Sequence, residues 1–310
     1  MTVIVKKQKK LGKPLGGLTK TLEKSIEQEI TGRSLWADAM RRFFNNKGAV
    51  VSLVILVLLI VAIIIGPWLS SYTIEQTDWS AIFSAPSGQH LFGTDELGRD
   101  LFVRTMAGGR VTLYVGFIAT FVSIVIGILY GATAGFIGGK VDGAMMRIVD
   151  VLYSLPFLFF VILLMTFFGR NFILMFIAIG AISWLDMARI VRGQTLSLKS
   201  KEFIEAAYAS GVSQFSIIIR HIVPNLLGVV VVYATLTVPT VILTAAFLSF
   251  LGLGVQAPMT SLGVLVNSGA QNMTIAWWSI AFPGAALALI LYCFNFIGDG
   301  LRDALDPKGH

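Results

Sequence analysis

The chain has 310 residues, of which 55% are hydrophobic and only 13% are charged, with a formal net charge of +7. Soluble domains carry about a quarter charged residues, so this composition excludes a soluble globular protein and indicates an integral membrane protein. The single cysteine, Cys293, excludes a disulfide framework, and the three scattered histidines exclude a metal cluster with regular spacing.

The sequence predicts an all-α polytopic membrane protein with six transmembrane helices. Residues 1–47 form a polar cytoplasmic arm, too long for a cleavable secretion signal, in which residues 36–44 favour a short amphipathic helix on the anionic inner leaflet. We predict a first transmembrane helix over 48–69, an extracytoplasmic loop over 70–110, a five-helix core over 111–300 and a cytoplasmic tail over 301–310. About 20 apolar residues cross the hydrocarbon, and the six apolar runs cover residues 49–66, 111–137, 151–169, 171–185, 225–250 and 277–298.

The distribution of basic residues predicts that both termini are cytoplasmic. The predicted outer segments hold four of the 24 Lys and Arg residues, so the other 20 lie inside, as the positive-inside rule requires. Most of the positive excess precedes residue 48, which argues against nucleic-acid binding. Trp68, Trp277 and Trp278 then fall at the outer interface, where an aromatic belt is expected.

No motif for catalysis or nucleotide binding is visible in the sequence. The segment around Lys140 lacks the upstream glycine and the hydroxyl of a phosphate-binding loop, and no Ser/His/Asp or Cys/His set is present. Energy for active transport must therefore come from an ion gradient or from a separate subunit. An ion-driven transporter would favour acidic residues near the midplane or broken inverted repeats, and neither is evident. A membrane scaffold that recruits a cytoplasmic partner remains a further alternative.

The inner loop over residues 196–224 has the strongest local signals. Residues 200–209 favour a helix, Gly211 can end it in a left-handed turn, and Ser213 is a good N-cap for the next helix. Pro224 suits the first turn of the fifth span. Ala206, Ala207 and Gly211 would allow a partner to approach closely.

This loop resembles the E-A-A loop of bacterial ABC importer permeases, at Glu205, Ala206, Ala207, Gly211 and Pro224. The resemblance implies an ABC importer type I permease fold. It also implies that the short helix, which includes Glu202, is the coupling helix seated in a cleft of the ATP-hydrolysing subunit.

A second segment, residues 92–100, reads F-G-T-D-E-L-G-R-D and lies just before the second span. Its charges alone predict ion pairs within the loop, between Asp95, Glu96 or Asp100 and Arg99 or Arg104. The pattern is similar to the F-G-T-D-x-x-G-R-D signature of the peptide and nickel group of these permeases. Residues 32–308 as a whole resemble the C-type permeases of bacterial oligopeptide transporters.

This resemblance implies a non-catalytic permease subunit of an ATP-driven oligopeptide importer in the bacterial inner membrane, with a dipeptide or nickel permease as the alternative. The implied partners are a homologous permease in a heterodimer, two cytoplasmic ATPase subunits, an extracytoplasmic peptide-binding protein and membrane lipid. ATP and Mg would bind the partner subunits, and this chain would bind no cofactor. Candidate polar residues of the translocation path are Thr166, Asn171, Thr235, Thr237, Thr244 and Asn267.

Small residues and prolines add two expectations about packing. Gly127, Gly131 and Gly135 recur every fourth position, which favours close helix packing either within the chain or with a partner permease. Three prolines fall inside the third, fifth and sixth spans and predict kinks there: Pro156, Pro239 and Pro283.

Overall fold

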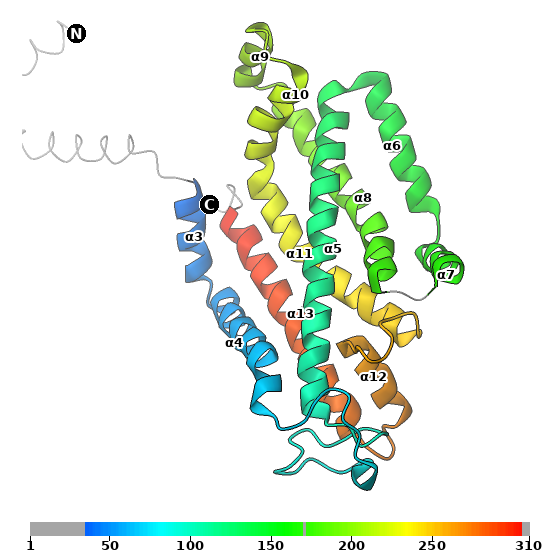
Figure 1. Cartoon of the computed structure of the whole chain (residues 1–310). Helices are drawn as coiled ribbons and strands as arrows, with labels where there is room; N and C mark the ends of the chain where they lie inside the picture. The colour runs from blue at the N-terminus through cyan, green and yellow to red at the C-terminus, as the bar shows by residue number, and fades with distance from the viewer. Residues whose placement is uncertain (1–34, 170–171, 306–310) are drawn as a thin grey trace, which may run out of the picture.

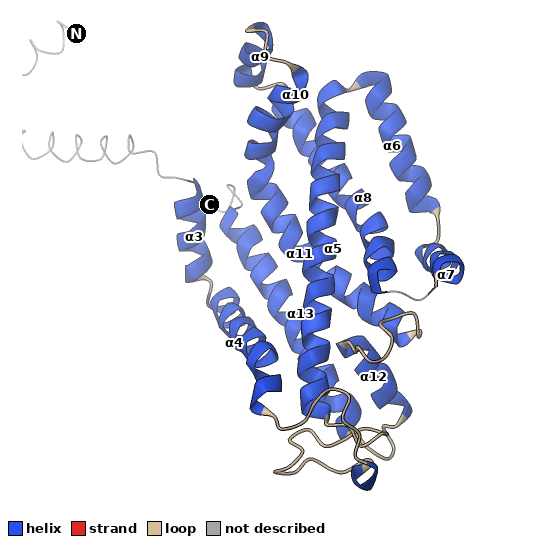
Figure 2. Cartoon of the chain, in the orientation of Figure 1, coloured by secondary structure: helices blue, strands red, loops and turns tan. Residues whose placement is uncertain are grey.

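A computed structural model describes residues 35–169 and 172–305, which form an elongated helical bundle (Figure 1, Figure 2). These residues contain no strand, and one isolated bridge joins Thr94 to Asp100. The elements in chain order are α3 (Leu35–Asn45), α4 (Lys47–Leu69), the 3-10 turn η2 (Trp79–Ala81), α5 (Leu101–Ile137), α6 (Gly139–Ser154), α7 (Phe157–Phe168), α8 (Phe172–Lys199), α9 (Glu202–Ala209), α10 (Gln214–Ile217), the π-helical turn η3 (Ile218–Ile222), α11 (Val223–Phe250), α12 (Leu262–Gln271) and α13 (Trp278–Leu305).

The expected membrane-spanning helices are present in large part. Among the described residues, four runs are long and apolar enough to cross a membrane: α4, α5, the continuous run Gln214–Phe250, and α13. The pair α6 and α7 adds a fifth if the two helices are one broken span. The predicted fourth span, residues 171–185, falls within α8, and Asn171 itself lies outside the described residues. The described part of the chain is therefore all-helical, with four to five apolar spans.

Helix α5 is the central element and packs along α8. At the glycines of α5 no side chain separates the two helices. A Cβ atom added at Gly131 would lie 2.3 Å from the carbonyl oxygen of Ala188, and one at Gly127 would lie 2.6 Å from Met187. Gly135 is similarly close to the backbone of α8. Of the two packing alternatives for these glycines, the structure shows contact within the chain.

The amphipathic segment before the first span is a helix, as predicted, and its buried side packs on protein. Ala39 and Phe43 of α3 belong to the same apolar cluster as the C-terminal part of α13. A Cβ atom at Gly300 of α13 would lie 3.4 Å from the Phe43 ring, so the glycine permits this contact. Trp36 and Met40 are exposed on the outer side of α3.

Both predicted ends of the five-helix core differ from the structure. Helix α5 begins at Leu101, ten residues before the predicted start at 111, because the side chain of Asp100 caps it by accepting a 3.0 Å hydrogen bond from the amide of Val103. The outer loop therefore ends at residue 100 rather than at 110. Helix α13 continues to Leu305, beyond the predicted core boundary at 300, because Gly298 and Gly300 allow close packing there.

The third predicted span is broken rather than kinked. Helix α6 ends at Ser154, α7 begins at Phe157, and the two axes differ by 81°. Pro156 disfavours a helical conformation for Leu155, which is extended with φ −74° and ψ 127°. Pro239 and Pro283, by contrast, lie inside continuous helices.

Polar contacts hold α6 beside α8. Arg192 of α8 binds Asp142 through two hydrogen bonds of 2.5 and 2.7 Å, and Arg189 binds Asp150 at 2.8 Å. The hydroxyl of Tyr153 also donates to Asp186 at 3.1 Å. Charged pairs thus supplement the limited apolar burial of α6.

Candidate functional site

The inner loop folds as its sequence predicts. Helix α9 carries Glu202 and Glu205 in its first turn, where carboxylates favour the positive end of the helix dipole. Gly211 follows with φ +78°, and the amide of Val212 bonds back to the carbonyl of Ala207 at 3.2 Å. The left-handed turn that ends the helix is therefore confirmed, although the helix begins at residue 202 rather than 200.

The return into the fifth span also follows local signals. The hydroxyl of Ser213 accepts a hydrogen bond from the amide of Ser216 at 3.3 Å and caps α10. Helix α10 continues through η3 into α11, where Pro224 lies in the first turn. This helical run begins at Gln214, so it enters the bundle earlier than the predicted residue 225.

Buried isoleucines attach this loop to the bundle. Ile204 is the one buried residue of α9, and Ile217 and Ile222 follow from α10 and η3. They belong to a cluster with residues of α5 and α8, namely Ile128, Ala132, Phe136, Met187 and Val191. Because α8 leads directly into α9, a displacement of α9 would act on both of these helices.

The remaining surface of α9 faces outward at one end of the molecule (Figure 1). Tyr208 is 61% exposed and Phe215 is 73% exposed. Sequence reasoning missed these aromatic side chains, since an aromatic residue beside apolar spans is usually buried. The predicted loop residues are exposed except Ala207, which is half-buried, and the exposed ones are Glu202, Glu205, Ala206, Gly211 and Pro224.

An open pocket of about 430 Å³ lies between α9 and the C-terminal end of α5. Glu205 and Lys199 contribute opposite charges to its lining, and Tyr208 contributes an aromatic wall. The Lys199 ammonium also lies 5.5 Å from the centre of the Phe136 ring. The loop therefore presents an exposed tyrosine, a residue type enriched at protein interfaces, beside charged side chains of the kind found at an interface rim.

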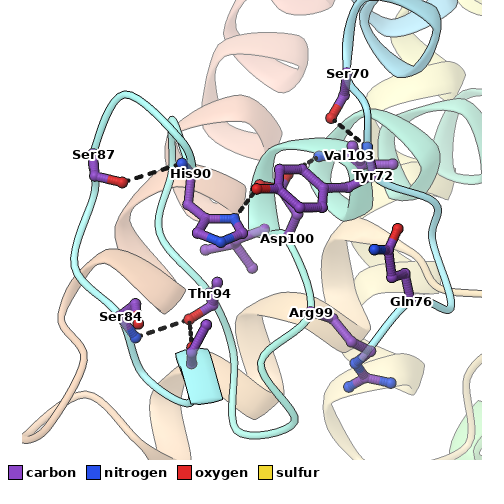
Figure 3. Close-up of polar contacts among 12 residues, drawn as sticks. Ser70, Tyr72, Gln76, Ser84, Ser87, His90, Thr94, Arg99, Asp100 and Val103 are labelled. Atoms are coloured by element: carbon purple, nitrogen blue, oxygen red, sulfur yellow. Dashed lines mark hydrogen bonds and ion pairs between the residues drawn. The ribbon is translucent and has the colours of Figure 1, made fainter. Parts of the chain in front are cut away.

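At the opposite end, residues 70–100 fold into a loop that closes on the start of α5 (Figure 3). The ring of His90 stacks on Tyr72 at 4.6 Å, and its Nδ1 atom lies 2.9 Å from Oδ2 of Asp100, the N-cap residue of α5. The hydroxyl of Thr94 accepts a hydrogen bond from the amide of Ser84 at 2.8 Å. These contacts fix the loop to the helix that follows it.

Of the ion pairs that the charges of the F-G-T-D segment predict, the structure shows those of Asp95. Asp95 binds Arg99 at 2.8 Å and Arg104 at 3.3 Å. Glu96 instead accepts a 3.0 Å hydrogen bond from Asn272, just after α12. The segment thus joins the outer loop to two separate helices.

The same loop buries a tryptophan that the sequence places at the membrane interface. The indole of Trp278 donates to the carbonyl of Thr94 at 3.2 Å, and Trp278 is buried. Gly93, with φ +74°, leaves room for this ring, since a Cβ atom there would lie 2.7 Å from the indole nitrogen. Trp68 and Trp277 are exposed, in keeping with the predicted belt.

One carboxylate of this outer loop is held by local hydrogen bonds. The hydroxyl and the amide of Ser80 both donate to Asp78, and these bonds lower the pKa of the Asp78 carboxyl. Asp78 lies beside Gly98, whose φ of +68° belongs to the tight turn after Asp95. The hydrogen bonds of Asp78 therefore stabilise the local turn at Ser80.

The candidate path residues lie on three different helices. Thr237 and Thr244, seven residues apart, share one face of α11. Thr235 lies on another side of α11, where a Cβ atom at Gly298 of α13 would be 3.4 Å from its hydroxyl. Thr166 is exposed on α7 and Asn267 is half-buried on α12.

In the described part of the chain, no three His, Cys, Asp or Glu side chains lie close enough together to hold a metal ion.

Two protein-family models match this chain, and both describe membrane components of transport systems. Residues 123–309 match the family described as binding-protein-dependent transport system inner membrane component. Residues 34–86 match the N-terminal TM domain of oligopeptide transport permease C.

Several curated relatives are similar over almost their full length. The oligopeptide transport system permease protein OppC of Haemophilus influenzae is 58% identical over 284 residues, which cover 91% of each chain. OppC of Escherichia coli K12 is 58% identical over 293 residues, 94% of this chain and 97% of that protein. The dipeptide transport system permease protein DppC of Bacillus subtilis is 45% identical over 92% of this chain and 91% of its own.

A solved structure shares the fold. The MetNI methionine ABC transporter in an inward-facing conformation matches with a TM-score of 0.52 at 23% identity, over 66% of this chain and 96% of that chain.

Proposed function

This chain belongs to the family of binding-protein-dependent transport system inner membrane components, and we propose its function from that membership. It is a multi-pass permease subunit of an ABC importer for oligopeptides in the bacterial inner membrane. It is not catalytic, because ATP hydrolysis belongs to a separate subunit of such importers. The observation that supports an oligopeptide substrate is the 58% identity to oligopeptide permeases over 91–94% of the chain. A dipeptide permease is the second candidate, favoured by the 45% identity to DppC.

We further propose six transmembrane spans with both termini in the cytoplasm. The spans would be α4, α5, the pair α6 and α7, α8, the run Gln214–Phe250, and α13. Two observations support this topology. Four Arg residues fall in the predicted outer segments against 20 basic residues elsewhere, and in Figure 1 the start of α3 and the end of α13 both lie toward the α9 end of the bundle.

Helix α9 is proposed as the contact to the ATPase subunit. Its exposed surface, its position at one end of the bundle and its small residues support this role. The proposed contact residues are Glu202, Glu205, Ala206, Ala207, Gly211 and Pro224. The ATPase subunits, two in number, would hold ATP and Mg. The other partners would be a homologous permease, which completes the membrane path, and an extracytoplasmic binding protein, which delivers the peptide.

The path through the membrane is proposed to include the exposed face of α11 with Thr237 and Thr244. Thr166 on α7 and Asn267 on α12 are further candidates, as is Asn171. Thr235 is proposed to serve the packing between α11 and α13, since it lies against Gly298.

The test is uptake of a labelled tetrapeptide or pentapeptide by cells that lack only this chain, with and without it restored. A dipeptide and nickel are measured in parallel. We expect restoration confined to the longer peptides. Restoration of the dipeptide or of nickel alone would move the substrate to the alternative. Restoration of none, with the protein inserted and its partners present, would contradict transport altogether.

A further inference from the structure

One face of α11 carries hydroxyl side chains between two aromatic ones. Tyr233, Thr237, Thr240, Thr244 and Phe247 are spaced by four, three, four and three residues, which places them along a single side of the helix. Tyr233, Thr240 and Phe247 are exposed, and Thr237 and Thr244 are half-buried. We name Thr237, Thr240 and Thr244 the threonine stripe.

The hydrogen bonds of the stripe determine what it can offer a ligand. Thr237 donates to the carbonyl of Tyr233 at 2.7 Å, Thr240 to that of Leu236 at 3.2 Å, and Thr244 to that of Thr240 at 2.8 Å. A hydroxyl has one proton to donate and two lone pairs that accept. Because each proton is already used, the outward side of the stripe presents acceptors.

The stretch of chain that carries the stripe contains no charged residue. The sequence has no Asp, Glu, Lys or Arg from residue 222 to residue 298, which covers the whole of α11 and of α12. Hydrocarbon chains have no N–H or O–H to donate to such acceptors, whereas every peptide carries main-chain N–H groups whatever its side chains. A peptide main chain is therefore the ligand that matches acceptors arranged along a helix without a charge.

We propose that the threonine stripe accepts hydrogen bonds from the main chain of the transported peptide, and that this contact is independent of the peptide's sequence. The inference rests on the proposed oligopeptide function. It adds Thr240 to the proposed path and assigns the stripe the role of a hydrogen-bond acceptor. Tyr233 and Phe247 bound the stripe with apolar ring surface that tolerates side chains of many kinds.

Thr235 supplies a matched control on the same helix. Its hydroxyl also donates to a carbonyl of α11, that of Val232 at 2.8 Å. It lies against Gly298 of α13 rather than on the exposed face. The same substitution at Thr235 and at Thr240 therefore separates the loss of a path acceptor from a general effect on α11.

The first experiment measures water and peptide access with a water-soluble maleimide, in membranes that contain the whole transporter and its binding protein. The only native cysteine, Cys293, is buried, so the unmodified chain is the blank. The variants are Thr240→Cys, Thr235→Cys and, on the exposed side of α4, Leu58→Cys. We expect rapid labelling of Thr240→Cys alone, slowed by a pentapeptide during turnover.

Two results would overturn the proposal. One is labelling of Thr240→Cys no faster than that of Leu58→Cys, both at rest and during ATP turnover. The other is rapid labelling that the pentapeptide does not slow. Uptake of the pentapeptide by the unmodified transporter, measured in the same membranes, tests the oligopeptide function separately.

The second experiment compares the triple variant Thr237→Val, Thr240→Val, Thr244→Val with Thr235→Val and with the corresponding triple Ser variant. Loss of several hydrogen bonds, at about 1 kcal/mol each, should lower kcat/KM for uptake by roughly tenfold or more. The reduction should be equal for neutral, acidic and basic pentapeptides, and the Ser triple should retain uptake. A Val triple that transports as well as Thr235→Val would contradict the proposal, as would a loss confined to peptides of one charge.

Discussion

At the scale of single residues, several side chains compensate for backbone groups that a helix leaves unpaired. Pro67 lies inside α4 and has no N–H to donate to the carbonyl of Ile63, four residues earlier. The guanidinium of Arg110, from α5, lies 3.4 Å from that carbonyl oxygen and 3.2 Å from that of Ile64. The charged side chain of Arg110 in the second span thus serves to pair backbone carbonyls of the first span.

This geometry predicts a coupled pair of substitutions. Arg110→Met should destabilise the purified complex by roughly 1–3 kcal/mol, because it leaves the Ile63 carbonyl without a donor. In a Pro67→Ala background the restored amide can serve that carbonyl, so the same substitution should cost less. Thermal unfolding of the four proteins of this cycle measures the difference. Equal costs in both backgrounds would show that Arg110 does not replace the missing donor.

Gly211 allows the turn conformation and the absence of a side chain to be tested separately. Its φ is +78°, and a Cβ atom there would meet nothing within 4 Å in this chain. Gly211→Leu should therefore cost about 1–2 kcal/mol through the backbone alone, and uptake should fall. Gly211→Asn should retain more uptake, because Asn tolerates the left-handed region.

Uptake and retention of the ATPase subunits on the purified permease are the measurements for both variants. Full retention of the ATPase subunits by both the Asn and the Leu variant would contradict an effect of the turn. Failure of both would instead indicate that the partner requires a position without a side chain.

At the scale of elements, the pairing of α5 with α8 depends on surfaces without side chains. The three glycines of α5 bring its backbone against α8, and the closest approach is at Gly131, next to the carbonyl of Ala188. Such packing contributes through van der Waals contact, because the membrane supplies little hydrophobic force between helices. Any added volume must push the two helices apart.

We therefore expect Gly131→Val to lower the thermal stability of the complex and its yield from membranes by more than any comparable change on α6. Gly143→Val is the matched control, because a Cβ atom there would meet nothing within 4 Å. Overpacking of a tight contact costs typically about 1–3 kcal/mol. Equal stability of the two variants would show that α8 can move away from residue 131 without a loss of stability.

At the scale of the whole molecule, the sequence predicted those features whose causes are local. Gly211 and Ser213 each act within a few residues, and the turn and the cap are found where they were expected. The apolar runs likewise identify the spans, because residence in lipid imposes length and composition directly.

Features that depend on distant partners were not predictable in the same way. The start of α5 was placed ten residues late because Arg104 and Arg110 interrupt the apolar run, and only the structure shows Asp95 and the α4 carbonyls that accommodate them. Trp278 was expected at an interface but is buried under a loop almost two hundred residues earlier in the chain. Which side of α11 packs on protein likewise depends on another helix, since Thr235 lies against Gly298 of α13.

The last prediction concerns communication along the length of the molecule. Glu205 is exposed at one end, on a helix that contacts the bundle through the buried Ile204 and the half-buried Ala207. Glu205→Lys should leave insertion and fold intact, since no hydrogen bond within the described residues depends on that carboxylate. It should weaken contact with the ATPase subunit by reversing a charge at the interface, so that hydrolysis continues without uptake.

The measurements are peptide uptake and ATP hydrolysis stimulated by the peptide-loaded binding protein, in reconstituted complexes. Glu75→Lys makes the same charge change on the exposed outer loop and should leave the ratio of the two rates unchanged. Normal uptake by Glu205→Lys in stable complexes would refute α9 as the coupling element. An equal loss in Glu75→Lys would assign the effect to net charge, because the two substitutions share nothing else.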